Sequence, residues 1–230
     1  MVKALVFGAS GGLASSIAEQ YLLRGGEVGL VTREGRLKQV ADRFAAPVAA
    51  GKATIHSIQD SYTSFSAKEP YNAYFFTQAL FNPTPLTGMT GERIADEIAV
   101  GLTDLILLTR SLLLAHPPAS GERRDFCFTG STSSYAGFKN TTVYCAVKHG
   151  LVGFVRALNE EYAHTQTRFW LFSMGSMDTE MGANVPLQDR ISFLQPDDVA
   201  GRIVDAVTHP SNMFEPEVLI RRRSILRVTA

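Results

Sequence analysis

Seven short apolar runs, separated by longer segments with helical periodicity, limit the folds open to this chain more than any other feature. In the longer segments apolar side chains recur every three or four residues, as at Ile94, Ile98 and Leu102, and share one helix face. Strands that alternate with helices predict an α/β fold with a doubly wound parallel sheet. The segment before the fourth run is short and contains Pro70, so we expect little helix there. The predicted strands are residues 3–7, 27–32, 53–58, 73–78, 125–129, 168–173 and 217–222.

The size and charge of the chain favour one domain that acts on a small molecule. Its 230 residues, 45% of them hydrophobic, can bury a substantial core, and we expect a single domain over residues 1–230. The 22 basic and 22 acidic residues cancel, so net charge attracts neither nucleic acid nor an anionic membrane. There is no run of about 18 apolar residues and no signal-peptide pattern, so a cytoplasmic location without membrane insertion is expected.

The cysteines and histidines point to neither a disulfide nor a metal site. Cys127 lies in a strand-like run and Cys145 in a helical one, so both are predicted to be small buried hydrophobes. The five histidines are scattered without the spacing of metal ligands. We therefore expect no metal.

A glycine cluster follows the first predicted strand and precedes a helix. Glycines at such a turn let backbone N–H groups approach a phosphate, and the helix N-terminus adds partial positive charge. A tight strand-to-helix turn of any kind also uses glycine, but this position in an alternating β/α chain favours a dinucleotide. The residues expected to hold the dinucleotide there are Gly8, Ser10, Gly11, Gly12 and Leu13.

The end of the second predicted strand indicates which dinucleotide is preferred. Sites that select NAD place an acidic residue here for the ribose diol, whereas a 2′-phosphate needs a cation. This chain has Thr32 and Arg33, which favours NADP(H) over NAD(H). In the alternative interpretation Arg33 is an ordinary exposed residue, and the neighbouring Glu34 supports that view.

A tyrosine and a lysine four residues apart, Tyr144 and Lys148, share one face of a predicted helix. Ser131 stands thirteen residues before the tyrosine, at the end of a strand. With the glycine turn, this combination resembles the short-chain dehydrogenase/reductase family over nearly the whole chain. The resemblance implies a single Rossmann domain with a seven-stranded parallel sheet in the order 3-2-1-4-5-6-7.

The resemblance also implies a role for each of these three side chains. Tyr144 would be the general acid/base, Lys148 its electrostatic partner and ribose ligand, and Ser131 would orient the carbonyl. An ammonium about 4 Å from the phenol, at an effective dielectric of about 20, would lower the phenol pKa by about three units. Ser131 could instead cap the strand end, with Ser133 or Ser134 in its role.

Two further segments match the family in part. Thr77, Gln78 and Ala79 stand where the family has Asn-Asn-Ala, and only Ala79 is retained. After the sixth strand the family has Pro-Gly and then Thr, and this chain keeps the glycine and the threonine. The cofactor contacts implied by the resemblance are Thr77, Gln78, Ala79, Gly175, Met177 and Thr179, besides Tyr144 and Lys148.

Gly101 is the departure with the largest chemical consequence. The family has an asparagine there that helps to hold a water beside the active-site lysine, and a glycine has no side chain for this. Three outcomes follow: backbone and water substitute for the asparagine, the proton relay is slower, or the reaction depends on it less.

The segment of residues 176–196 is expected to face the substrate. It carries Met181, Val185, Leu187, Ile191 and Phe193, which would line an open pocket for an apolar carbonyl compound or pack a surface helix. We predict NADPH-dependent reduction of a ketone or aldehyde, or the reverse oxidation of an alcohol. The alternatives are another reaction on the same scaffold (enone reduction, epimerisation or dehydration) and a cofactor sensor without turnover.

The resemblance further implies a homodimer or homotetramer. Apolar side chains on the two long helices could form the contact between copies or could pack on the sheet. They are Leu105, Leu108 and Leu112 on one helix, and Val147, Leu151 and Phe154 on the other.

Overall fold

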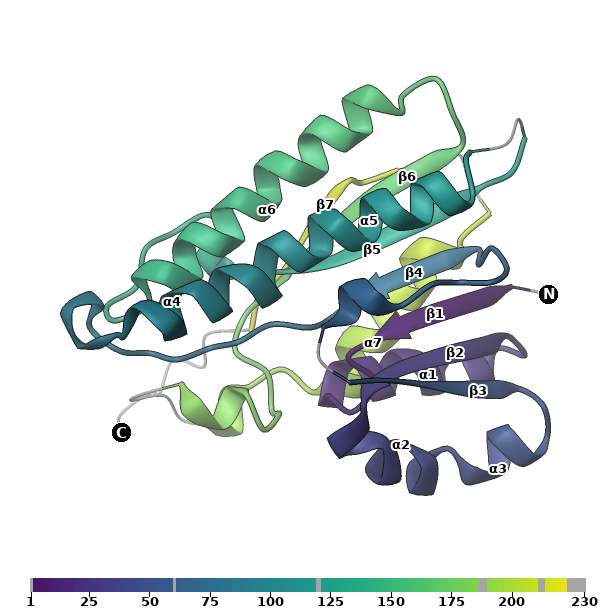
Figure 1. Cartoon of the computed structure of the whole chain (residues 1–230), viewed down its shortest axis with the longest axis horizontal. Coiled ribbons are helices and arrows are strands. Elements are labelled where there is room, and N and C mark those ends of the chain that lie inside the picture. The colour runs from purple at the N-terminus through teal and green to yellow at the C-terminus, as the bar shows by residue number, and fades with distance from the viewer. Residues whose placement is uncertain (1, 60, 119–120, 186–189, 211–213, 223–230) are drawn as a thin grey trace, which may run out of the picture.

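The computed structural model has seven parallel strands in one sheet, in the order β3-β2-β1-β4-β5-β6-β7 (Figure 1). It describes residues 2–59, 61–118, 121–185, 190–210 and 214–222. The predicted fold and strand order are therefore confirmed, and each predicted strand has its counterpart. The strands are β1 (Lys3–Phe7), β2 (Glu27–Arg33), β3 (Ala53–Ile58), β4 (Ala73–Phe76), β5 (Arg124–Ser131), β6 (Thr167–Met174) and β7 (Glu217–Ile220).

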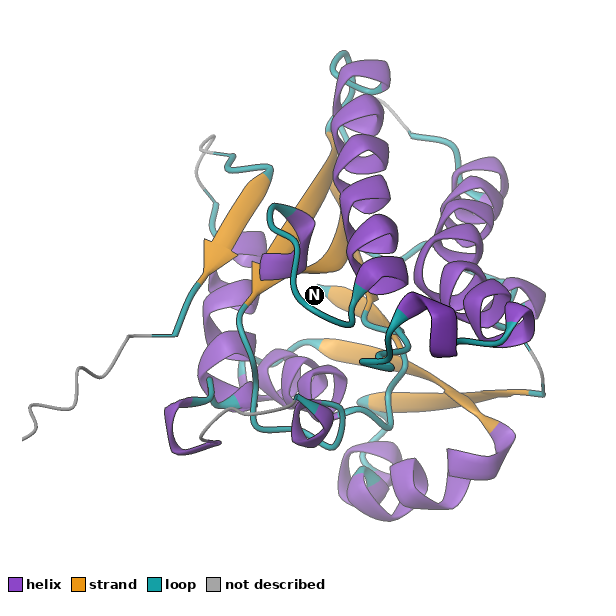
Figure 2. Ribbon diagram, turned by 90° about the vertical axis from the view of Figure 1, so that its left-hand side faces the viewer, coloured by secondary structure: helices purple, strands orange, loops and turns teal. Residues whose placement is uncertain are grey.

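Helices cover both faces of this sheet, and each face buries a separate apolar core (Figures 1 and 2). Strand side chains alternate between the two cores, so Val6 of β1 lies in one and Phe7 in the other. On the first face lie α1 (Gly12–Leu23), α2 (Leu37–Arg43) and α7 (Pro196–Thr208). On the second lie α5 (Asp104–Ala115) and α6 (Thr142–Glu161), while α3 (Ala45–Ala49) follows α2 and α4 (Gly91–Ile98) lies beside α6.

The apolar side chains singled out on α5 and α6 pack on the sheet. Leu105, Leu108 and Leu112 are at most 2% exposed, and Leu151 is fully buried. The apolar side chains that α5 does expose are Ile106, Leu107 and Leu114. Of the two alternatives, packing on the sheet therefore holds for these four leucines, and contact between copies through the two helices stays a prediction.

One helical stretch, Gly91–Ala115, is long and apolar enough by composition alone to cross a membrane. A third of its most apolar window is buried inside the protein, with α5 resting on the sheet. Core helices of ordinary globular proteins meet the same criterion, so this stretch is weak support for membrane insertion.

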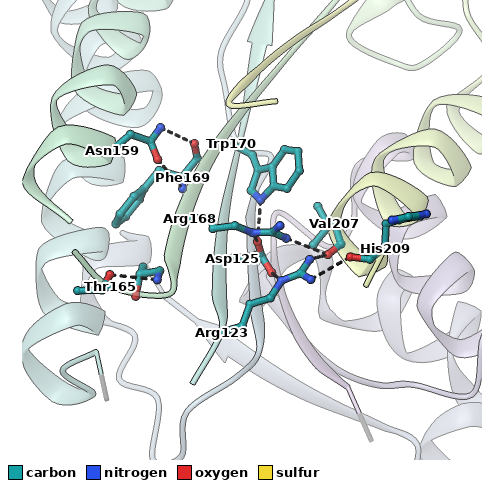
Figure 3. Close-up of polar contacts among 10 residues, drawn as sticks. Arg123, Asp125, Asn159, Thr165, Arg168, Phe169, Trp170, Val207 and His209 are labelled. Atoms are coloured by element: carbon teal, nitrogen blue, oxygen red, sulfur yellow. Dashed lines mark hydrogen bonds and ion pairs between the residues drawn. The ribbon is translucent and has the colours of Figure 1, made fainter. Parts of the chain in front are cut away.

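A dense polar network lies at the edge of the sheet where β5 and β6 begin (Figure 3). The Asp125 carboxylate accepts hydrogen bonds from Arg168 Nε at 2.7 Å, Trp170 Nε1 at 2.7 Å and Arg123 Nε at 3.1 Å. Both arginines also donate to the Val207 carbonyl in the last turn of α7. The network thus satisfies a helix terminus and ties α7 to the sheet.

Candidate active site

The glycine turn lies at the carboxyl edge of the sheet, between β1 and α1. Gly8 has a φ of +79°, and a Cβ there would lie 2.9 Å from Thr77 Oγ1. The Thr77 hydroxyl donates to the Phe7 carbonyl at 2.7 Å, which holds β4 against the end of β1. Only glycine satisfies both the backbone angle and the space at position 8.

Other predicted cofactor residues surround the same turn. Gly11 is the N-cap residue of α1, and Ser10 is half-buried beside it. A Cβ on Gly12 would lie 2.9 Å from Thr179 Cγ2, so the segment after β6 closes directly on this turn. Leu13 points into the core, which leaves its backbone for a ligand. The structure therefore brings the two ends of the predicted cofactor site together.

Polar groups without partners are buried next to the turn. Neither amide atom of Gln78 has a hydrogen-bond partner in the described part of the chain, although the residue is only 6% exposed. Ala79 follows it and is half-buried. Buried polar groups are almost always satisfied, so an unsatisfied amide beside a phosphate-type turn suits a polar ligand. This observation fits a nicotinamide dinucleotide.

Thr32 and Arg33 take different orientations at the end of β2. Thr32 is fully buried, whereas Arg33 is exposed and lies over the Tyr62 ring, 5.8 Å from its centroid. Among the described residues no carboxylate forms an ion pair with Arg33. Of the two, Arg33 is the one whose side chain can reach a ribose phosphate.

The segment after β6 returns across the carboxyl edge. The Gly175 N–H donates to the Ile220 carbonyl at 2.9 Å, and Met177 is 9% exposed. The Thr179 hydroxyl accepts from the Gly182 N–H at 3.0 Å. Farther along, Phe193 is buried but Ile191 is 82% exposed. Met181 is 37% exposed and Val185 half-buried, while Leu187 lies outside the described residues.

Ser131, Tyr144 and Lys148 converge where β5 ends and α6 begins. Ser131 Oγ accepts from the Ser133 N–H at 3.1 Å, so the residue does cap the short turn after β5. Its hydroxyl also comes close enough to the Tyr144 phenol to lower the pKa of that phenol. Ser133 and Ser134 are both buried. Ser131 therefore caps the turn, as one interpretation expected, and also lies beside Tyr144, as the catalytic interpretation requires.

The electrostatics of the tyrosine and lysine differ from expectation. Burial raises the pKa of Tyr144 to about 12, against a lowering contribution from Ser131. Burial also lowers the pKa of Lys148 to about 8. Lys148 Nζ donates to the Thr129 carbonyl at 2.7 Å and lies 5.6 Å from the Tyr144 ring centroid. The predicted lowering of the phenol pKa is wrong for this arrangement, because burial dominates and Lys148 is not among the groups that shift this pKa.

Comparison with known families identifies the chain. A family model described as short chain dehydrogenase matches residues 2–190. The chain belongs to the short-chain dehydrogenase/reductase family. Among curated relatives, an uncharacterized oxidoreductase of Staphylococcus epidermidis is 26% identical over 228 residues, covering 95% of this chain and 96% of that protein.

A second relative of this dehydrogenase/reductase is named for its activity. The 3-oxoacyl-(acyl-carrier-protein) reductase FabG of Salmonella typhimurium is 28% identical over 186 residues, covering 77% of this chain and 74% of FabG. Among solved structures, a short chain dehydrogenase from Burkholderia cenocepacia in complex with NADP has a TM-score of 0.81. It is 18% identical and covers 96% of both chains. That likeness confirms the fold.

Gly101, which replaces the family's asparagine, lies in a π-helical turn, Ala99–Thr103, between α4 and α5. A Cβ at this position would lie 2.6 Å from Val147 Cγ1 of α6. The glycine therefore allows the two helices to approach closely.

Sequence reasoning missed Glu97, which lies one turn before Gly101. The residue is 1% exposed, and its charge raises the pKa of Tyr144. In the sequence it is one of several acidic residues in α4 and has no distinguishing motif. Its burial can be recognised only from the structure.

Proposed function

We propose that this dehydrogenase/reductase reduces a ketone or aldehyde to an alcohol with NADPH, or oxidises the alcohol in reverse. The observation that carries the proposal is the convergence of Ser131, Tyr144 and Lys148 at the carboxyl edge, beside the glycine turn. The cofactor supplies a hydride for the carbonyl carbon. The protein must then supply one proton for the carbonyl oxygen.

Tyr144 is the group placed to give that proton. The Ser131 hydroxyl, which lies close to the phenol, can donate to the carbonyl oxygen and hold it beside Tyr144. As negative charge grows on the oxygen, the phenol O–H bond breaks and the proton moves to that oxygen. Lys148 stabilises the resulting phenolate through its charge, held in place by the Thr129 carbonyl.

The proposed preference for NADPH rests on Arg33. Its guanidinium is exposed at the end of β2, next to the turn, and could pair with a 2′-phosphate in a bidentate manner. The NADP complexes among the structurally similar proteins support the same preference. We propose that Arg33→Asp weakens binding of NADPH at least tenfold and leaves NADH binding nearly unchanged, as measured by fluorescence titration. Equal losses for both cofactors would contradict this preference.

The central test follows NADPH oxidation over a panel of carbonyl compounds, with the wild type and Tyr144→Phe. We expect the variant to bind NADPH normally and to lose a factor of about 10² to 10⁴ in kcat. Phenylalanine preserves the ring and its edge contact with Phe81, where the centroids are 4.9 Å apart, and so removes only the hydroxyl. Unchanged turnover would contradict the mechanism, and NADPH binding without any turnover would favour a sensor.

The remaining expectations about location and assembly are proposals as well. We propose a cytoplasmic enzyme that forms a homodimer or homotetramer through the exposed apolar side chains Ile106, Leu107 and Leu114 of α5. Ile106→Glu and Leu107→Glu, tested by light scattering, should reduce the assembled mass. Cell fractionation tests the location.

A further inference from the structure

The short helix α4 buries a single side chain, and that side chain is a glutamate. All eight residues of α4 are described, and Glu97 is the buried one. It is 1% exposed, less than many apolar residues of the core. A carboxylate is among the groups least often buried without a partner, so the burial of Glu97 needs a chemical explanation.

No group in the described part of the chain neutralises Glu97. Neither of its carboxyl oxygens has a hydrogen-bond partner of normal geometry. The Asn82 amide comes close enough to lower its pKa, and the charge of the exposed Arg93 adds a smaller lowering contribution. Desolvation is larger than both and raises the pKa. Glu97 is therefore a buried carboxylate that forms no ion pair with any of the described residues.

Glu97 belongs to the surroundings of the reacting carbonyl. The charge of Glu97 acts on the Tyr144 phenol, and α4 packs against α6, which carries that tyrosine (Figure 1). Phe81 lies edge-on against the Tyr144 ring, and the neighbouring Asn82 reaches the carboxylate. Glu97 is therefore a buried carboxylate in the neighbourhood of the proposed proton donor.

We propose that Glu97 selects carbonyl substrates that carry a positively charged amino group, by pairing with that group while Tyr144 meets the carbonyl oxygen. This inference rests on the proposed carbonyl reduction, and in the reverse direction it predicts amino alcohols. A desolvated carboxylate discriminates strongly, because a neutral substrate leaves it unpaired and an anionic one repels it.

The pairing would also assist the proton transfer. The negative charge of Glu97 is one of the causes that raise the pKa of Tyr144. A bound ammonium cancels that charge, so the phenol becomes a stronger acid in the loaded site than in the empty one. A cationic substrate should therefore have a higher kcat as well as a lower KM.

The test compares three ketones of the same shape that carry an ammonium, a methyl or a carboxylate group. Wild type, Glu97→Gln and the control Glu92→Gln are assayed with NADPH, and NADPH binding is measured for each. Glu92 lies on the same helix but is exposed, so its substitution changes the charge without changing the site.

In the wild type we expect kcat/KM for the ammonium ketone to exceed that for the methyl ketone at least about 30-fold, with the carboxylate ketone poorest. Glu97→Gln should abolish the preference and keep NADPH binding, whereas Glu92→Gln should behave as wild type. No preference in the wild type, a preference that survives Glu97→Gln, or equal losses for all ketones would overturn the inference. If none of the ketones is reduced by the wild type, the carbonyl reduction itself fails.

Discussion

Asp125 at one edge of the sheet, and Gln78 and Glu97 at the other, are all buried but differ in their hydrogen bonding. At the amino edge Asp125 is 4% exposed and accepts hydrogen bonds from Arg123, Arg168 and Trp170. At the carboxyl edge the polar atoms of Gln78 and Glu97 are buried without hydrogen bonds in the described part of the chain. Satisfied groups stabilise the fold, and unsatisfied ones are tolerated where a ligand completes them.

The largest expected effect on stability is at the amino edge. Asp125→Ala removes the acceptor of two arginines and a tryptophan and should lower the free energy of unfolding by about 3 to 5 kcal/mol, as measured by urea denaturation. Below the unfolding midpoint, kcat should stay within twofold of wild type.

The control for this change is Asp205→Ala. Asp205 pairs with Arg24 at 2.6 Å, but its side chain is 62% exposed, so its loss should cost less than about 1 kcal/mol. If the two substitutions proved equally mild, the amino edge would not be the structural anchor that its hydrogen bonds suggest.

A smaller effect is expected at Lys148, whose buried ammonium lowers the free energy of unfolding instead of raising it. Burial lowers its pKa from 10.5 to about 8, so between these values the unfolded chain holds a proton that the folded chain has released. Wild-type stability relative to Lys148→Met should therefore rise with pH, by about 2 kcal/mol between about pH 8 and pH 9.5. The penalty of the buried ammonium is fully present below pH 8. A pH-independent difference between the two proteins would show that Lys148 is not desolvated.

The smallest stability change is expected at Gln78. Gln78→Leu replaces an unsatisfied amide by an apolar group of similar size, and should change the free energy of unfolding by less than about 1 kcal/mol. Binding of NADPH should weaken in the same variant, as measured by fluorescence. A large loss of stability with normal NADPH binding would show that Gln78 has a structural role, as Asp125 does at the amino edge.

Much of the fold could be predicted because its signals are local. The strand beginning at Lys3 and the positive φ of Gly8 follow from apolar patterning and from the chemistry of a tight turn. Tyr144 and Lys148 could be paired because helical spacing alone places them on one face.

What could not be predicted depends on burial. The pKa of Tyr144 is raised rather than lowered because burial dominates, and no sequence pattern shows how far a phenol is removed from water. Glu97 is one acidic residue among several in the sequence, and only the structure shows that it is buried. The faces of α5 and α6 were likewise ambiguous, because an apolar stripe does not say whether a sheet or another copy covers it.

The close approach of Gly101 to Val147 constrains how this sequence can change over generations. A side chain at position 101 would meet Val147 Cγ1, so the family's asparagine fits there only if Val147 moves or becomes smaller. A smaller residue at position 147 alone would leave a gap beside the glycine. The two positions are therefore expected to change as a pair among descendants of this protein.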